Sequence, residues 1–348
     1  METADASRRR EPVLVDLALQ GGGSHGAFTW GVLDRLLEEP WLRIDGISGT
    51  SAGAMNAAVL AAGYAADGAE GARTALASFW ASVSDAARFS PLRRGPLDVL
   101  LDRWTLDNSP AFIAMELTSR LLSPYDLNPG GGNPLRDILA AHIDFARLAT
   151  APIKVFVTAT NVRTGRGRVF RNAEITPEVM LASACLPTLF QAVEIDGEAY
   201  WDGGYSGNPT ITPLVRECMS RDTILVQINP VERPGTPRSA RDIVNRLNEV
   251  SFNAVLLKEL RMIALLRQVA GPGEEDTEGA AWAEMRIHRI DSPEMVELGY
   301  SSKLNAEWAF LTLLRDRGRQ AADSFLSTHG DALGKRSSYA VDELLQGV

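Results

Sequence analysis

Residues Val13 to Gly26 read VLVDLALQGGGSHG, a short apolar run that passes directly into a glycine turn. The run is rich in valine and leucine and has the length of one buried strand, as in a parallel sheet. After the turn, apolar residues recur at helical spacing until Pro40. The stretch therefore predicts a strand over Val13–Leu19, a tight turn and a helix, which together form the first unit of an α/β fold.

A second unit of the same kind follows at once. Ile44–Ser48 predicts a strand, and a second glycine turn leads into a helix of small residues over Ala52–Ala62. Further buried strands are expected over Pro152–Thr160 and Thr223–Ile228. Alternating strands and helices favour a three-layer α/β/α sandwich around a mainly parallel central sheet.

The later part of the chain has a different pattern. Apolar residues at helical spacing predict a long amphipathic helix after Pro237 and another over Lys303–Gly318. We expect a flexible N-terminal arm over 1–12, an α/β domain over 13–230, and a mostly helical C-terminal extension over 231–348 that packs on that domain.

The segment 84–132 is rich in proline and glycine and is too long for a simple connection. Its apolar piece, Ala111–Leu122, fits a lid, a membrane-facing helix or a packed core helix equally well. The sequence leaves open whether this segment covers a site.

Composition excludes several classes of protein. The 348 residues carry 35 Lys and Arg against 44 Asp and Glu, a net charge of −9, which argues against binding nucleic acid. Two cysteines, Cys185 and Cys218, provide no disulfide framework and suit a reducing compartment. Neither a clear signal peptide nor a transmembrane run is visible. We interpret the chain as cytoplasmic, with peripheral membrane contact and the oligomeric state left open.

The first glycine turn, Gly21 to Gly26, follows a strand and opens a helix. It matches G-x-G-x-x-G, so a dinucleotide site is one interpretation, although no clear ribose-binding acid follows. Glycines leave backbone N–H groups accessible at the positive end of a helix, where they bind a phosphate or a developing oxyanion. A tight turn without a ligand remains the third interpretation.

The second glycine turn reads Gly49-Thr50-Ser51-Ala52-Gly53. This is G-x-S-x-G between a strand and a helix, the setting in which a serine hydroxyl is exposed on a sharp turn. The context predicts that Ser51 is a nucleophile, and a nucleophilic serine needs a base.

Candidates for that base are few. Three of the four histidines lack recognisable catalytic surroundings, and His25 lies inside the first glycine turn; the four are His25, His142, His288 and His329. Asp202-Gly203-Gly204 follows a probable strand, Glu198–Trp201, and places a carboxylate where neighbouring backbones can approach closely. Alone, however, it is also an ordinary turn.

Together the three motifs resemble the patatin-like phospholipase family. The motifs are Gly21–Gly26, Gly49–Gly53 and Asp202–Gly204, in that order, with Ser183-Ala184-Cys185-Leu186-Pro187 before the last strand. The similarity covers roughly Val13 to Ile228. It implies a lipid acyl hydrolase that uses a Ser–Asp dyad, without a catalytic histidine, a cofactor or a metal.

Carried over residue by residue, the resemblance makes Ser51 the nucleophile and Asp202 the base. The remaining site positions are glycines: the oxyanion hole (Gly21, Gly22, Gly23 and Gly26), the nucleophile elbow (Gly49 and Gly53) and the Asp-Gly-Gly motif (Gly203 and Gly204). The family often has Arg or Lys where this chain has His25, which leaves the role of that side chain open. Metal ligand spacing is not evident either.

The expected function is therefore cleavage of carboxylic esters in phospholipids or related acyl lipids through an acyl-enzyme intermediate. Two alternatives remain: hydrolysis of other esters, such as polyesters or thioesters, by the same dyad, and a non-catalytic lipid-binding protein.

Overall fold

The computed structural model describes residues 10–269 and 278–346, and eight strands within them form one sheet. The strands are β1 (Val13–Leu19), β2 (Leu42–Gly49), β3 (Lys154–Asn161), β4 (Gly167–Arg171), β5 (Val193–Ile195), β6 (Glu198–Asp202), β7 (Asp222–Val226) and β8 (Arg286–Ile290). Their order is β5-β6-β3-β2-β1-β7-β8, and β4 also pairs with β3. Five neighbouring strands run parallel, namely β3, β2, β1, β7 and β8. At the other edge, β4 and β6 are antiparallel to β3, and β5 is antiparallel to β6. The predicted mainly parallel sheet is confirmed.

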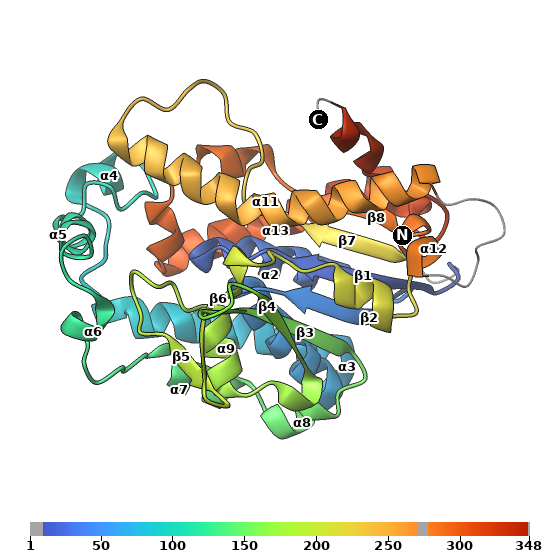
Figure 1. Ribbon diagram of the computed structural model, residues 1–348, viewed down its shortest axis with the longest axis horizontal. Coiled ribbons are helices and arrows are strands. Elements are labelled where there is room, and N and C mark those ends of the chain that lie inside the picture. Colours follow the sequence, from blue (N-terminus) through green and yellow to red (C-terminus); the bar gives the residue numbers. More distant parts are fainter. Residues whose placement is uncertain (1–9, 270–277, 347–348) are drawn as a thin grey trace.

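Helices cover both faces of this sheet (Figure 1). They are α2 (Gly26–Leu36), α3 (Ala52–Ala86), α4 (Pro96–Leu100), α5 (Pro110–Thr118), α6 (Pro124–Leu127), α7 (Leu135–His142), α8 (Phe145–Ala149), α9 (Pro177–Ser183), α10 (Thr212–Glu217), α11 (Ala240–Val269), α12 (Glu278–Ala283) and α13 (Trp308–His329). No described helix combines the length and the apolar composition needed to cross a membrane.

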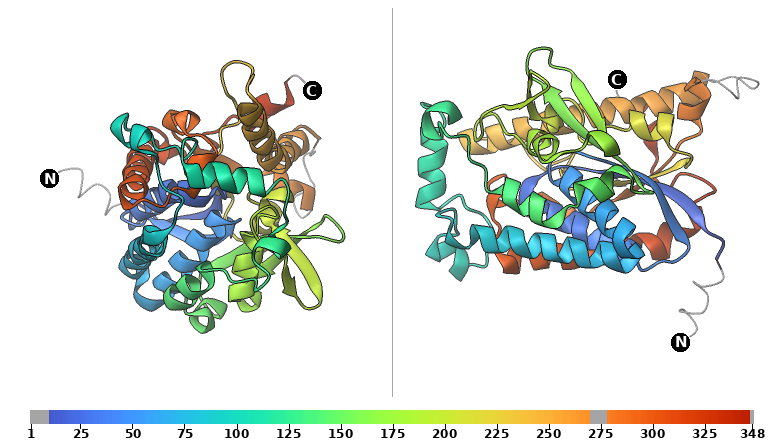
Figure 2. Two further views of the ribbon diagram at one scale, coloured as in Figure 1. Left: turned by 90° about the vertical axis from the view of Figure 1, so that its left-hand side faces the viewer. Right: turned by 90° about the horizontal axis from the view of Figure 1, so that it is seen from below.

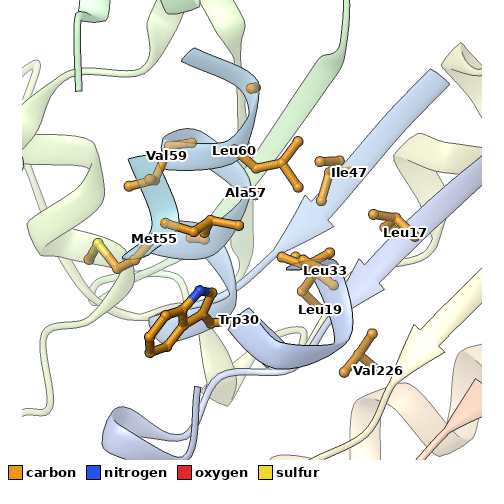
Figure 3. Packing of buried hydrophobic residues seen from close by; sticks show 14 of the residues in the cluster. Leu17, Leu19, Trp30, Leu33, Ile47, Met55, Ala57, Val59, Leu60 and Val226 are labelled. Atoms are coloured by element: carbon orange, nitrogen blue, oxygen red, sulfur yellow. The ribbon is translucent and has the colours of Figure 1, made fainter. Parts of the chain in front are cut away.

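Alternate side chains of β1 enter two separate cores, as the two-residue repeat of a strand requires. Leu17 and Leu19 pack with residues of α2, α3 and α13, and Figure 3 shows them facing Leu33. Ala18, on the opposite face, packs with residues of α10, α11 and α12, among them Leu260. The three-layer α/β/α sandwich expected from the sequence is therefore confirmed.

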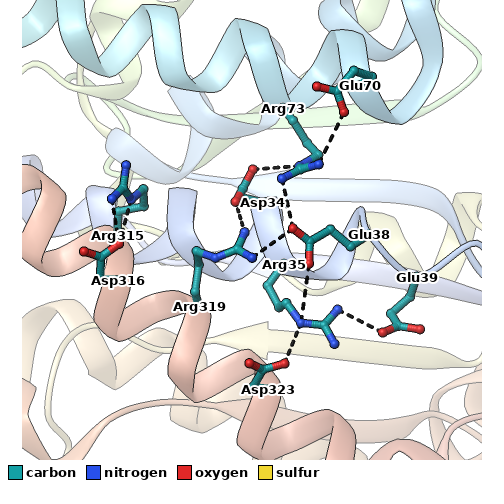
Figure 4. A network of polar contacts seen from close by, with 10 residues as sticks. All are labelled: Asp34, Arg35, Glu38, Glu39, Glu70, Arg73, Arg315, Asp316, Arg319 and Asp323. Atoms are coloured by element: carbon teal, nitrogen blue, oxygen red, sulfur yellow. Dashed lines mark hydrogen bonds and ion pairs between the residues drawn. The ribbon is translucent and has the colours of Figure 1, made fainter. Parts of the chain in front are cut away.

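The C-terminal residues are joined to this sandwich in two ways. β8 extends the sheet by pairing with β7, and α13 packs along α2. Arg319 of α13 forms ion pairs with Asp34 of α2 and, at 2.8 Å, with Glu38 just after α2, and Arg73 of α3 pairs with the same two carboxylates (Figure 4). Because these side chains are partly buried, the network fixes α13 against α2 and α3 more firmly than isolated surface pairs would.

Several helix boundaries differ from the predictions. α3 continues to Ala86 through a kink at Asp67 and Gly68, where the backbone leaves helical geometry. The last long helix begins at Trp308, not at Lys303, which lies in a short 3₁₀ turn, η6 (Ser301–Leu304). Most of the arm expected over 1–12 lies outside the described residues.

The segment 84–132 contains the short helices α4, α5 and α6. Phe112 is the only fully buried side chain of α5, while Leu117 is 57% exposed and Leu121, just beyond the helix, is 85% exposed. The interpretation of Ala111–Leu122 as a packed core helix is therefore wrong.

Candidate active site

A cavity of about 290 Å³ opens where the two glycine turns, the end of β6 and the turn η6 meet. Most of its wall is apolar, with Phe79 and Trp80 of α3 among the largest side chains. The predicted residues Ser51 and Asp202 line it together, although 150 residues lie between them in the chain. Gly21, Gly22 and Gly23 also line it.

Ser51 occupies the turn between β2 and α3 with φ 54° and ψ −123°. A non-glycine residue in such a conformation is strained, as is usual at a nucleophile elbow. Its backbone N–H donates to Ser183 Oγ at 2.9 Å, and that hydroxyl donates to the Thr158 carbonyl at 2.7 Å. Gly49 and Gly53 permit the turn, because a Cβ on Gly49 would lie 2.6 Å from the Gly53 carbonyl carbon.

Ser183 is a supporting residue that sequence reasoning did not assign. It stands at the end of α9, inside the stretch that contributed to the family resemblance. Its neighbours in sequence carry no sign that its hydroxyl reaches Ser51. Only the packing of α9 over β3 brings the two serines together.

Asp202 lies at the end of β6, and only 2% of its surface is exposed. Its carboxylate accepts a hydrogen bond from the Gly204 N–H at 2.7 Å and interacts with the Ser51 side chain. Burial raises the pKa of Asp202 to about 7, against the opposing effects of these two interactions and the charge of Lys303. A carboxylate with this pKa can exchange a proton with a serine hydroxyl near neutral pH.

The four glycines of the first turn differ in whether their amides are free. The Gly21 N–H donates to Asn208 Oδ1 at 2.7 Å, and the Gly26 N–H is bonded to carbonyls of the turn itself. Among the described residues, neither Gly22 nor Gly23 donates its amide to a protein acceptor. These two amides are therefore the ones available to an oxyanion.

Gly23 has φ 58° and faces the backbone carbonyl of Lys303 so closely that a side chain would clash with it. The contact places η6 directly against the glycine turn. Gly203 and Gly204 form the turn η4 (Gly203–Tyr205), where Gly203 approaches the Thr158 carbonyl in the same way.

His25 points away from the cavity. Its Nε2 bonds Ser302 Oγ at 2.8 Å, and its ring meets Phe310 edge-on at 6.2 Å. Burial lowers the pKa of His25 well below its ordinary value, so the ring is neutral at physiological pH. His25 therefore holds η6 against the glycine turn and supplies no charge to the cavity.

The other three histidines are also engaged elsewhere. His142 bonds Ser82 at 2.7 Å, His288 is buried between Asp222 and Ser338, and His329 packs on Phe325; all four histidines are described, and none lines the cavity. A serine–histidine pair is thus absent from this cavity as the structure describes it.

One buried cluster was not visible in the sequence. Potential metal-ligand atoms of Asp16, Asp45 and Cys218 lie within 4.8 Å of one another, on strands and a loop away from the cavity. Burial raises the pKa of Asp16 to about 8, and Asp45 pairs with Lys154 at 3.1 Å. A protonated carboxyl and a carboxylate already paired with lysine make poor ligands, so we assign no metal here.

Comparisons with known proteins identify a family for this chain. The family model "Patatin-like phospholipase" matches residues 17–215, whereas the search of curated proteins found no significant match. Among solved structures, the chain is similar to VipD from Legionella pneumophila (16% identity, TM-score 0.40, covering 92% of this chain and 67% of VipD).

It is also similar to ExoU from Pseudomonas aeruginosa, in its complex with SpcU (20% identity, TM-score 0.33, covering 82% of this chain and 59% of the other). The chain thus spans about three fifths to two thirds of the length of these structures. The family match includes Ser51, Asp202 and the first glycine turn, and it covers more than half of the sequence. The chain belongs to the patatin-like phospholipase family.

Proposed function

We propose that this protein is a serine lipid acyl hydrolase that cleaves carboxylic esters of phospholipids or related acyl lipids through a Ser51–Asp202 dyad. The observation that carries the proposal is that Ser51 and the buried Asp202 line the same apolar cavity and interact directly through their side chains. An apolar wall suits an acyl chain, and the direct contact needs no intervening histidine.

The reaction follows from these positions. Asp202 accepts the proton of the Ser51 hydroxyl while its oxygen attacks the ester carbonyl, and the Gly22 and Gly23 amides stabilise the oxyanion. The protonated Asp202 then gives its proton to the departing alcohol, which leaves an acyl-Ser51 ester. Water, deprotonated by Asp202, attacks this ester; the fatty acid leaves, and the proton returns to the Ser51 oxygen.

A panel of three esters tests the substrate class. We expect hydrolysis of a phospholipid in mixed micelles and of a short-chain aryl ester, with release of fatty acid measured by titration. A polyester particle is expected to be cleaved poorly, because its chain would have to enter a cavity of about 290 Å³. Preferential cleavage of the polyester would favour the alternative hydrolase, and no cleavage of any ester would favour a lipid-binding protein.

We also propose that one end of the molecule contacts a lipid surface. Figures 1 and 2 show α4, α5 and α6 together at this end. Their segment and the first half of α11 expose large apolar side chains, namely Leu97, Leu100, Leu117, Leu121, Leu122, Tyr125, Leu127, Leu247 and Val250, which we call the apolar end surface. Arg241 of α11 lies 3.6 Å from Glu116 of α5, so the two parts adjoin.

This apolar end surface continues to the cavity. The Ala192 N–H donates to the Tyr125 hydroxyl at 3.3 Å, and Gln191 donates to the Asn128 carbonyl at 2.6 Å. The residues just before them in the chain, Leu189 and Phe190, line the cavity. A bilayer at this surface would therefore present its lipids close to the cavity, and contiguous exposed apolar patches typically mark interaction sites.

The double variant Leu117→Asp/Leu121→Asp is expected to bind phospholipid vesicles at least about tenfold more weakly, since two exposed leucines lose their burial in lipid. Binding is measured by vesicle sedimentation, and hydrolysis of vesicle lipid should fall in parallel. Cleavage of a soluble aryl ester should stay within about twofold. Val269→Asp, an exposed apolar position at the other end of α11, is the control and should bind normally. Unchanged vesicle binding by the double variant would contradict the proposal.

A further inference from the structure

Lys303 brings a positive charge into the cavity from a part of the chain outside the matched family region. It lies in η6, lines the cavity, and donates from Nζ to Asn229 Oδ1 at 2.7 Å. An ammonium has three donors, so two remain for a ligand. Within the described chain, it is the only lysine or arginine that lines this cavity.

The charges around Lys303 do not neutralise it. Among the described residues, no carboxylate lies within 4.0 Å of its ammonium, so it has no ion pair. Two carboxylates, Glu249 and Asp202, attract Lys303 without forming an ion pair with it. Glu249 is already bound by Arg233 at 2.7 Å and by Arg246 at 3.2 Å. Arg233 itself repels Lys303. Burying a cation without a counter-ion costs free energy, which an anionic ligand would recover.

Further donors lie on the same wall. Asn208 lines the cavity, is completely buried, and has no partner for its Nδ2. Asn229, which holds Lys303, also donates to the Gly21 carbonyl at 2.8 Å. The backbone carbonyl of Lys303 contacts Gly23. The ammonium is thus tied to the same turn whose Gly22 and Gly23 amides are free.

We infer that Lys303 binds the phosphate of the substrate, so that the preferred lipid carries a phosphodiester next to the ester that Ser51 attacks. The inference rests on the proposed function and narrows it, because a neutral glyceride would offer the Lys303 ammonium no ion-pair partner, while Asp202 attracts it without pairing with it. In a glycerophospholipid the phosphate and the ester of the central glycerol carbon belong to neighbouring carbons. A cation beside the proposed oxyanion hole is therefore in the right place to contact it.

The test compares two lipids that share their acyl chains, a phosphatidylglycerol and a diacylglycerol, in the same neutral detergent micelles. Lys303→Met, which keeps the length of the side chain and removes the charge, should lower kcat/KM for the phospholipid by about tenfold to a hundredfold, the usual effect of losing a charged hydrogen bond. Cleavage of the diacylglycerol should fall much less than that of the phospholipid, because removal of the Lys303 charge affects it only through the pKa of Asp202. Lys303→Arg should recover much of the phospholipid activity.

Other outcomes would overturn this inference. An equal loss on both lipids would mean that Lys303 acts on the ester chemistry itself, and no loss on either would mean that it binds no substrate. If added fatty acid inhibits Lys303→Met less than the wild type while phospholipid cleavage is unchanged, Lys303 binds the carboxylate of the fatty acid product and not the phosphate of the substrate. Failure of the proposed function is distinguishable, because in that case the wild type would hydrolyse neither lipid.

The pH dependence of lipid cleavage by the wild type provides a second test. Burial lowers the pKa of Lys303 to about 8; Arg233 lowers it too, while Glu249 and Asp202 oppose the shift. The remaining titratable neighbours, His25 and Tyr300, are neutral at pH 7 to 9. The ratio of phospholipid to diacylglycerol cleavage should therefore fall between pH 7 and pH 9, and a constant ratio would count against a charged Lys303 at the phosphate.

Discussion

Ser51→Ala should lower kcat/KM for a soluble aryl ester by at least about 10⁴-fold, to the residual rate that binding and the oxyanion hole alone support. The substitution removes only the hydroxyl oxygen that attacks the ester. The backbone contact of Ser51 with Ser183 does not involve that oxygen and should persist. The fold should therefore remain, which circular dichroism and the melting temperature would verify.

Ser327→Ala is a suitable control for this experiment. Ser327 lies on the exposed side of α13, where its hydroxyl bonds only the Ser324 carbonyl of its own helix. Its loss should leave both hydrolysis and folding unchanged. A folded Ser51→Ala protein that retains more than about a tenth of wild-type activity would show that the nucleophile lies elsewhere and would end the dyad proposal.

Features set by local sequence were predictable. β1 spans Val13–Leu19 as expected, because a short run of valine and leucine followed by glycines admits few other structures. The turn around Ser51 could be predicted equally well, since the strand, the glycines and the helix are contiguous in the sequence. α3 was underestimated: its small residues continue past Gly68, and the kink there gave no clear end signal.

Features set by long-range packing were not predictable. The proximity of Ser51 and Asp202 could be expected only through the family resemblance, because no local pattern reports a contact across 150 residues. Lys303 was assigned to a helix, and nothing near it in sequence indicates a cavity. The neutral state of His25 likewise depends on its burial beside Ser302 and Phe310.

The same packing explains how His25 and Lys303 differ in their effect on the site. His25 occupies a motif position where the family often has a cation, but it donates no charge to the cavity. Lys303 arrives from η6, which His25 itself helps to hold through Ser302. A positive charge thus enters the cavity from the C-terminal region, so residues beyond the matched stretch contribute to its wall.

Asp202→Asn should lower kcat/KM for the aryl ester about as far as Ser51→Ala does, because the amide cannot accept the serine proton. In the wild type, the unprotonated carboxylate is the active form. With a pKa of about 7, activity on a neutral ester should rise from pH 6 to pH 8 and be half-maximal near pH 7. The control is Asp196→Asn, an exposed turn residue next to β6, which should retain full activity and the same pH profile.

Histidine variants separate a dyad from a triad. His329→Ala should retain most activity, and so should His288→Ala when the rate is expressed per folded molecule, since His288 is buried against Asp222. His142→Ala should do the same, and His25→Ala should be partly impaired through η6. A loss of about 10³-fold in His288→Ala or His329→Ala would establish a triad, in which Asp202 merely orients a histidine.

Asp202→Asn should make the folded protein more stable while it lowers the activity. Burial raises the folded-state pKa of Asp202 from 3.8 to about 7, so the stability that its protonated form contributes is fully present below pH 4 and is lost as pH rises through 7. Asparagine can keep the bond from the Gly204 amide without carrying a charge. Asp202→Asn should therefore melt at a higher temperature than the wild type at pH 8, with a smaller difference at pH 5. Equal melting temperatures of the wild type and Asp202→Asn at pH 8 would mean that the ionised Asp202 carboxylate costs the fold no stability. Its pKa would then not be raised by burial, and Asp202 would not be the buried base that the dyad requires as the proton acceptor for Ser51.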